Sequence, residues 1–212
     1  MKIKYLLITV VVFIAIYVFK CHNSVVPVFE MELDKLILVN KNNPISEVFK
    51  PNDLTLIENN NDKNILIRDE VNTKYKEMLK DASKHSLNMY VVSGYRSYEY
   101  QESIFEKNAT KDGIDVANTY SAKPGESEHQ TGLAIDIGNG VCDVEECFDK
   151  SKEYKWLAKN SYKYGFILRY PKNKTDITGY IYEPWHYRYV GVDVAKQIYD
   201  SKLTLEEFLK YN

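Results

Sequence analysis

Residues 133–138, with the sequence LAIDIG, form the segment that most limits how this chain can fold. Side chains alternate along a strand, so the aliphatic residues at 133, 135 and 137 share the face that can enter a core. Asp136 lies on the other face with the small residues Gly132 and Ala134, which leave room for a group to approach it. A carboxylate on a buried strand is costly unless it is paired or bound to a metal. The segment therefore predicts either a polar site at Asp136 or an aspartate that caps a turn near Gly138.

Two of the four histidines stand in dense local patterns. His129 lies upstream of Asp136 in SEHQTGLAID, and His186 closes the run EPWH. In a strand Glu183 and His186 would point to opposite faces, but Pro184 removes a ladder donor and bends the chain, so both can converge. A zinc hydrolase needs three ligands, an open position for water and a nearby base, and these four side chains supply them. The alternative for the second pattern is an aromatic core strand with a hydrogen-bonded histidine.

A third pattern, SGYRS at 93–97, predicts a turn from a strand into a helix. Arg96 at that turn can bind a substrate carboxylate through both ends of its guanidinium, or stabilise the oxyanion that forms on attack. The alternative is a surface salt bridge.

Helical and strand periodicities alternate irregularly along the chain, which favours the α+β class. We expect helices over residues 69–85, 97–108, 152–165, 191–202 and 204–211. Ser97 is the expected cap of the second helix, and Thr204 with Glu207 has the spacing of a capping box. We expect strands over residues 35–40, 88–93, 133–138, 166–170 and 184–190, with irregular chain over 41–57 and a loop leading to 133.

The three patterns together resemble the VanY-type D-alanyl-D-alanine carboxypeptidases, a zinc LD/DD-carboxypeptidase family of bacterial cell walls. The resemblance rests on SGYRSYEYQ (93–101), PGESEHQTGLAID (124–136) and EPWHYRYVG (183–191), and it spans roughly residues 35–210. It implies a small central antiparallel sheet flanked by helices, of the hedgehog/DD-peptidase kind, with the zinc site on the sheet face.

The resemblance also implies a role for each site residue. One zinc ion per chain would be bound by His129, Asp136 and His186, and Glu183 would take a proton from bound water and pass it to the leaving amine. Arg96 would hold the scissile carbonyl oxygen or the terminal carboxylate. Two further side chains, Ser127 and Gln101, look like substrate contacts. Two aromatic residues would line the pocket, although core packing is expected for at least one of them: Trp185 and Tyr187.

The activity implied by the resemblance is removal of the C-terminal D-alanine from peptidoglycan stem peptides. A tetrapeptide stem would make the activity L,D and a pentapeptide stem D,D, and the motifs do not separate the two. Two alternatives stay open. An endopeptidase on the same fold would need a groove open at both ends, and a non-catalytic wall-binding zinc module would usually lack the base or a ligand.

The N-terminal residues 1–21 contain the uncharged run YLLITVVVFIAIYVF, flanked by lysines. We expect a single-pass membrane anchor with the catalytic domain (35–212) outside the cell, joined by a stalk (22–34), or alternatively a cleaved signal and a secreted protein. The chain has a formal net charge of −2, and residues 1–21 hold three lysines and no acid, so the remainder carries about −5. That charge argues against nucleic acid as a partner. We expect a monomer.

The cysteine usage fits an extracellular domain. Cys142 and Cys147 lie close together in VCDVEECF, and outside the cell such a pair is expected to form a disulfide across a short loop.

Overall fold

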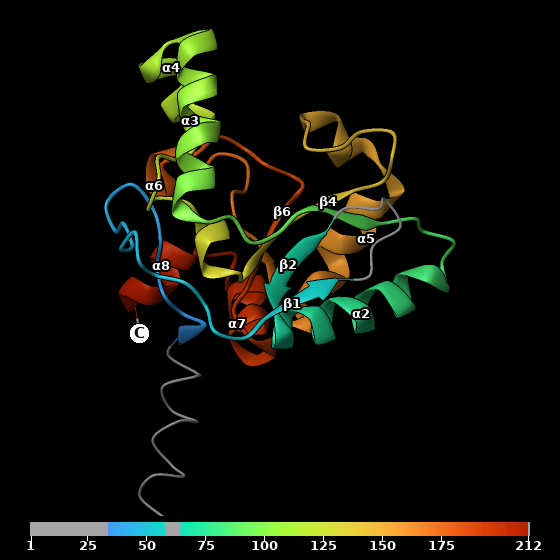
Figure 1. Ribbon diagram of the computed structural model, residues 1–212. Helices are drawn as coiled ribbons and strands as arrows, with labels where there is room; N and C mark the ends of the chain where they lie inside the picture. Colours follow the sequence, from blue (N-terminus) through green and yellow to red (C-terminus); the bar gives the residue numbers. More distant parts are fainter. Residues whose placement is uncertain (1–33, 58–63, 212) are drawn as a thin grey trace, which may run out of the picture. The chain divides into compact units, whose positions relative to one another are not determined.

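The computed structural model describes residues 34–57 and 64–211, and the chain divides into two units, Met1–Ile37 and Leu38–Asn212 (Figure 1). The second unit carries every candidate site residue. The expected anchor or signal segment and nearly all of the expected stalk lie outside the described residues. None of the helices in the two described ranges has the length and apolar character that a membrane crossing requires.

A four-stranded antiparallel sheet forms the centre of this second unit. Its strands lie in the order β3 (Tyr90–Ser93), β4 (Ala134–Gly138), β6 (His186–Tyr189) and β5 (Phe166–Leu168). Every neighbouring pair is antiparallel, which confirms the expected α+β class with a small antiparallel sheet. Both faces of β4 are buried, and Ile135 and Ile137 are fully enclosed in the core.

A second, two-stranded antiparallel sheet pairs β1 (Leu54–Ile57) with β2 (Ile65–Arg68). The prediction of irregular chain over 41–57 was therefore wrong for its last four residues, which form a partly exposed strand. Backbone hydrogen bonds join β2 to two segments of the site: Tyr95 N–H donates to Leu66 O at 2.7 Å, and Arg68 N–H to Gly132 O at 3.2 Å. The small sheet thus holds the chain on the approach to both α3 and β4.

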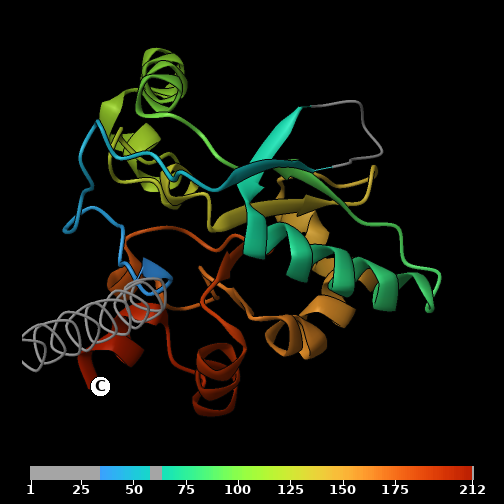
Figure 2. The ribbon, with the colours of Figure 1, turned by 60° about the horizontal axis from the view of Figure 1, so that its bottom comes forward.

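Helices surround the sheet, and the five predicted ones are present. They are α2 (Asp69–Ser83), α3 (Tyr98–Asp112), α5 (Lys152–Asn160), α7 (Val192–Ser201) and α8 (Leu205–Tyr211). A further helix, α4 (Ile114–Tyr120), lies between α3 and the predicted loop, and it was not predicted. Shorter turns of helix are α6 (Thr175–Thr178), η1 (Glu128–Thr131), η2 (Glu146–Lys150) and η3 (Ser161–Tyr164). In both views α3 and α4 lie on the other side of β4 from α2 (Figures 1 and 2).

Local capping explains where α3 and α8 begin. The Ser97 side chain accepts a hydrogen bond from Tyr100 N–H at 3.2 Å, as expected for the cap of α3. Thr204 and Glu207 form the predicted capping box of α8: Thr204 N–H donates to the Glu207 carboxylate at 2.8 Å, and Glu207 N–H to Thr204 Oγ1 at 3.2 Å.

The expected strand over 35–40 is absent from this described segment. Residues 37–39 have no regular structure, and Asn40 makes only an isolated bridge with Asn43. The Asn40 side chain accepts hydrogen bonds from the N–H groups of Asn42 and Asn43, both at 3.0 Å. Such a side-chain turn competes with strand pairing, and it explains why this apolar run does not extend into a strand.

Candidate metal centre and active site

The register of β4 against β6 places two of the three predicted zinc ligands side by side. Asp136 is the direct partner of His186 in that ladder, and Asp136 Oδ1 lies 3.0 Å from His186 Nδ1. His129 comes from η1, which ends at Gly132 in the left-handed region (φ 67°), so the chain turns directly into β4. His129 Nε2 lies 3.3 Å from Asp136 Oδ2. One ligand atom from each of the three buried side chains lies within 4.8 Å of the others.

The outer ring nitrogens of both histidines have partners of their own. His129 Nδ1 lies 2.7 Å from Gly94 O, and His186 Nε2 lies 3.5 Å from Glu128 Oε2. Metal-binding histidines ordinarily donate their second N–H to a carbonyl or carboxylate, which fixes the tautomer and the ring orientation. Two oriented imidazoles and a carboxylate, buried and convergent, are the donor set of a catalytic zinc site. The residues present therefore fit zinc.

Glu183 lies in a turn just before β6, not within a strand, and this turn brings its side chain close to the metal ligands. His186 N–H donates to Glu183 O at 3.2 Å, so residues 183–186 form a turn that begins β6. The Glu183 carboxylate lies 3.7 Å from His186 Nδ1 and faces the same cavity. Burial, with a further contribution from the Asp136 carboxylate, raises the pKa of Glu183 to about 7 although His186 opposes the shift. A carboxyl group with its pKa near neutrality is suited to proton transfer.

Arg96 is held by three hydrogen bonds beside the ligands. Its guanidinium donates to Asp136 Oδ2 at 3.0 Å, to Ser93 Oγ at 3.0 Å and to Gln101 Oε1 at 3.3 Å. The side chain is 19% exposed and its ion-pair partner is buried, so the surface salt-bridge alternative is wrong. Gln101 in turn donates to Ala122 O at 2.7 Å, which fixes the amide oxygen that faces Arg96.

One cavity of about 390 Å³ joins the ligands, Glu183, Arg96 and Gln101. Ser127 and Trp185 also line it, in agreement with where the sequence placed them. Ser127 additionally accepts a hydrogen bond from His129 N–H at 3.4 Å, so it caps η1. Tyr187 does not line the cavity: it is fully buried and pairs with Ile135 in the ladder between β4 and β6, which is the core-packing alternative. The contributions of Ser127, Gln101 and Trp185 to substrate binding stay predictions.

Sequence reasoning missed a buried network of charges behind the ligands. Glu128 Oε1 accepts from Arg169 Nε and from Arg188 Nη1, each at 2.7 Å, and all three side chains are fully enclosed. Arg169 also forms a two-point ion pair with Glu206 on α8, at 2.6 and 2.7 Å. Burial would raise the pKa of Glu128, but the two guanidinium groups outweigh it and hold the pKa well below its usual range. Glu128 therefore faces His186 as a carboxylate.

A signal for this network exists in the sequence. Arg169 and Arg188 stand inside the strand runs FILRY and HYRYV, where an unpaired cation is as costly as an unpaired carboxylate. The physical reason that singled out Asp136 applies equally to them.

The chain matches a family of known proteins over most of this domain. The family model of VanY D-alanyl-D-alanine carboxypeptidases matches residues 64–192. The putative carboxypeptidase YodJ of Bacillus subtilis is 46% identical over 183 residues, covering 82% of this chain and 67% of that protein. The chain spans between 57% and 67% of the length of three curated relatives that it matches.

Two solved structures share the fold. The LD-carboxypeptidase LdcB superposes with a TM-score of 0.79 at 45% identity, over 83% of this chain and 86% of that one. A mutant of the vancomycin resistance D,D-pentapeptidase VanY in complex with Zn(II) gives a TM-score of 0.72 at 36% identity, over 83% and 99%. Both superpositions cover 83% of this chain, so the fold match includes most of the domain that carries the candidate site. The chain belongs to the VanY family of D-alanyl-D-alanine carboxypeptidases.

Proposed function

We propose that this chain is a zinc-dependent carboxypeptidase that removes the C-terminal D-alanine from peptidoglycan stem peptides. The observation that supports it most is the convergence of two oriented histidines and Asp136 beside a buried glutamate whose pKa lies near 7. The zinc-bound VanY relative and the LD-carboxypeptidase relative support the metal and the reaction class.

One zinc ion per chain would be held by His129 Nε2, His186 Nδ1 and the Asp136 carboxylate. When bound, zinc lowers the pKa of a water molecule toward about 7 and polarises a carbonyl group. Glu183 accepts the proton of the attacking water and returns it to the amine that leaves as the peptide bond breaks. The proton thus moves through one carboxylate, whose buried position keeps its pKa close to the working pH.

Arg96, Gln101 and Ser127 would recognise the end of the substrate. The Arg96 guanidinium lies beside Asp136, so it can hold a terminal carboxylate or the scissile carbonyl oxygen close to the ligands. Three polar groups gathered on one cavity favour an exopeptidase over an endopeptidase, whose groove must continue past the scissile bond.

Product analysis tests the proposal. Synthetic tetrapeptide and pentapeptide stems, with and without a chelator, are analysed by mass spectrometry. Chelator-sensitive loss of one C-terminal alanine is expected, and the better substrate distinguishes L,D from D,D activity. Equally rapid cleavage of C-terminally amidated peptides would instead support an endopeptidase, and zinc binding without any hydrolysis would support a wall-binding module.

The location of the protein is part of the proposal. We infer that residues 1–21 anchor a monomeric enzyme at the membrane with its catalytic domain outside the cell, where peptidoglycan lies. Protease treatment of intact cells should digest the domain, and the mass of the purified protein shows whether the segment is removed.

A further inference from the structure

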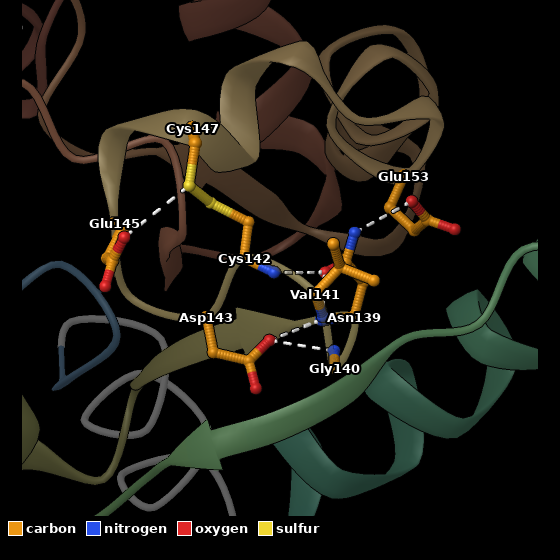
Figure 3. Close-up of a disulfide and its surroundings, with 8 residues drawn as sticks. All are labelled: Asn139, Gly140, Val141, Cys142, Asp143, Glu145, Cys147 and Glu153. Atoms are coloured by element: carbon orange, nitrogen blue, oxygen red, sulfur yellow. Dashed lines mark hydrogen bonds between the residues drawn. A yellow bond between two sulfur atoms is a disulfide. The ribbon is translucent and has the colours of Figure 1, made fainter.

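A disulfide-closed loop contributes one residue to the lining of the cavity. Cys142 and Cys147 are bonded, with their Cα atoms 5.9 Å apart, as expected from the sequence (Figure 3). Between them, Val144 contributes to the cavity lining and is 38% exposed. Val141 lies just before this loop, is 91% exposed and does not line the cavity. The loop therefore presents one valine to the cavity, and its neighbour Val141 remains in solvent.

Val144 has a backbone conformation that a valine rarely adopts. Its φ is +56°, in the left-handed region, where the branched side chain collides with its own backbone. Such conformations persist only where the surroundings impose them, and they are concentrated at functional sites. The position of this side chain at the rim of the cavity thus has a conformational cost that glycine would avoid.

Several bonds fix the loop to β4, the strand that carries Asp136. Asp143 Oδ1 accepts the N–H groups of Asn139 at 2.8 Å and Gly140 at 2.9 Å (Figure 3). The Tyr90 hydroxyl donates to Asp143 Oδ2. Asn139 Oδ1 accepts the N–H group of Cys142 at 3.0 Å. The Cys142–Cys147 disulfide joins the two ends of the loop. Val144 is accordingly held at a fixed place relative to the metal ligands.

Helices contribute other parts of the cavity wall. Ile104 and Asn108 on α3 and Tyr120 on α4 line the same cavity. The ligands and Glu183 are buried, whereas Val144 lines the same cavity and is partly exposed, so it lies at the rim. A peptide whose last residue is cleaved at the ligands must leave the cavity past such a rim.

We propose that Val144 is a specificity-determining residue, held by the Cys142–Cys147 disulfide, that contacts the part of the stem peptide on the N-terminal side of the scissile bond. The proposal rests on the proposed carboxypeptidase function. The apolar rim favours longer stems over a minimal D-Ala-D-Ala dipeptide because only the longer substrate reaches it.

The test compares Val144→Ala and Val144→Gly with Val141→Ala as the matched control. Substrates are a synthetic pentapeptide stem ending in D-Ala-D-Ala and N-acetyl-D-Ala-D-Ala. For both Val144 variants we expect the preference for the pentapeptide in kcat/KM to fall roughly fivefold, mainly through KM, as expected for loss of one to two methylene contacts. Val144→Gly should keep or raise Tm, which separates lost contact from damaged folding. An unchanged preference in both variants overturns the proposal.

The disulfide is tested by the double variant Cys142→Ser/Cys147→Ser. We expect the same fall in preference, because release of the loop lets Val144 leave its disfavoured conformation. A lower Tm with an unchanged preference would show that the bond only stabilises the fold, and it would overturn the positioning part of the proposal.

Equilibrium binding separates this proposal from the proposed function. The Val144 substitutions are repeated in zinc-loaded Glu183→Gln protein, and pentapeptide binding is measured by calorimetry. If the Val144 variants bind the pentapeptide more weakly but the wild-type protein does not hydrolyse it, the Val144 contact is supported and the carboxypeptidase function is rejected. Hydrolysis by wild type with equal binding by all variants would reject the contact alone, and absence of both binding and hydrolysis would reject both.

Discussion

Asp136 and His186 are direct partners across the β4–β6 ladder, with Oδ1 and Nδ1 3.0 Å apart. The pairing of two central strands thus sets the distance between two metal ligands, and no loop has to close for them to meet. Sites built on paired strands are held more rigidly than sites built on loops, so we expect changes in the chemistry of the site to leave its geometry intact.

Glu183→Gln should retain zinc and lose turnover. The amide keeps the shape of the side chain but cannot accept the proton, so kcat should fall by about 10²–10⁴-fold. Zinc content by elemental analysis and kcat on a stem peptide are measured together, with the exposed Glu102→Gln on α3 as control. A variant with near-normal turnover would rule out Glu183 as the base.

Glu128→Gln should weaken both folding and metal binding. Removing this carboxylate leaves Arg169 and Arg188 buried without their shared counter-charge, which costs roughly 3–5 kcal/mol of unfolding free energy. Loss of a carboxylate partner behind His186 should lower zinc affinity by about 10–100-fold. Denaturant unfolding of the metal-free protein measures the first effect, and competition with a chromogenic chelator measures the second. Unaltered zinc affinity would limit Glu128 to a role in stability.

Arg96→Lys should separate the two roles open to the arginine. Lysine keeps the charge but not the planar fork that reaches Asp136, Ser93 and Gln101 together, so kcat/KM should fall about 10²-fold. If Arg96 holds the terminal carboxylate, an amidated peptide is a poor substrate for both proteins and the difference between them disappears. If the difference persists on the amidated peptide, Arg96 holds the scissile carbonyl oxygen instead.

The metal-free protein should lose stability as the pH rises toward neutrality because of Glu183. Its folded pKa of about 7 lies above the ordinary value of 4.5, so the folded state binds the proton more tightly than the unfolded state. The resulting stability is fully present below about pH 4.5 and is lost as the pH rises to about 7, by roughly 3 kcal/mol. Unfolding of chelator-treated wild type and Glu183→Gln is compared at pH 5 and 7.5. Wild type should lose more stability than the variant, and parallel curves would contradict the buried, neutral carboxyl.

The convergence of His129, Asp136, His186 and Glu183 on one site was predictable because their residue types are costly or rare in their positions. A carboxylate inside LAIDIG requires a partner whatever the tertiary structure, and the two histidines stand in the dense local patterns SEHQTG and EPWH. The family resemblance then assigned roles, and the central sheet that it implied is present. Spacing alone left Glu183 and His186 on opposite faces, and only the turn over 183–186 shows how they converge.

The buried charge network and the remaining strand assignments depended on strand register and on pairing between distant segments. Glu128 meets Arg169 and Arg188 only when β4, β5 and β6 have assembled, and no local pattern encodes that meeting. The strand β1 follows a segment broken by Pro44 and Pro51, and it becomes a strand by pairing with β2. The apolar run before Asn40 failed as a strand because that side chain forms a local turn.

The ion pair between Arg169 and Glu206 has a consequence for biosynthesis. Glu206 lies on α8, the last helix described. Its carboxylate is the second partner of Arg169, beside Glu128, in the buried network behind the candidate ligands, although it is synthesised after all of them. A nascent chain that stops short of residue 206 leaves Arg169 with a single carboxylate shared with Arg188. The charge network behind the candidate metal site is therefore complete only after α8 has docked, so a chain that ends before residue 206 carries an unfinished network.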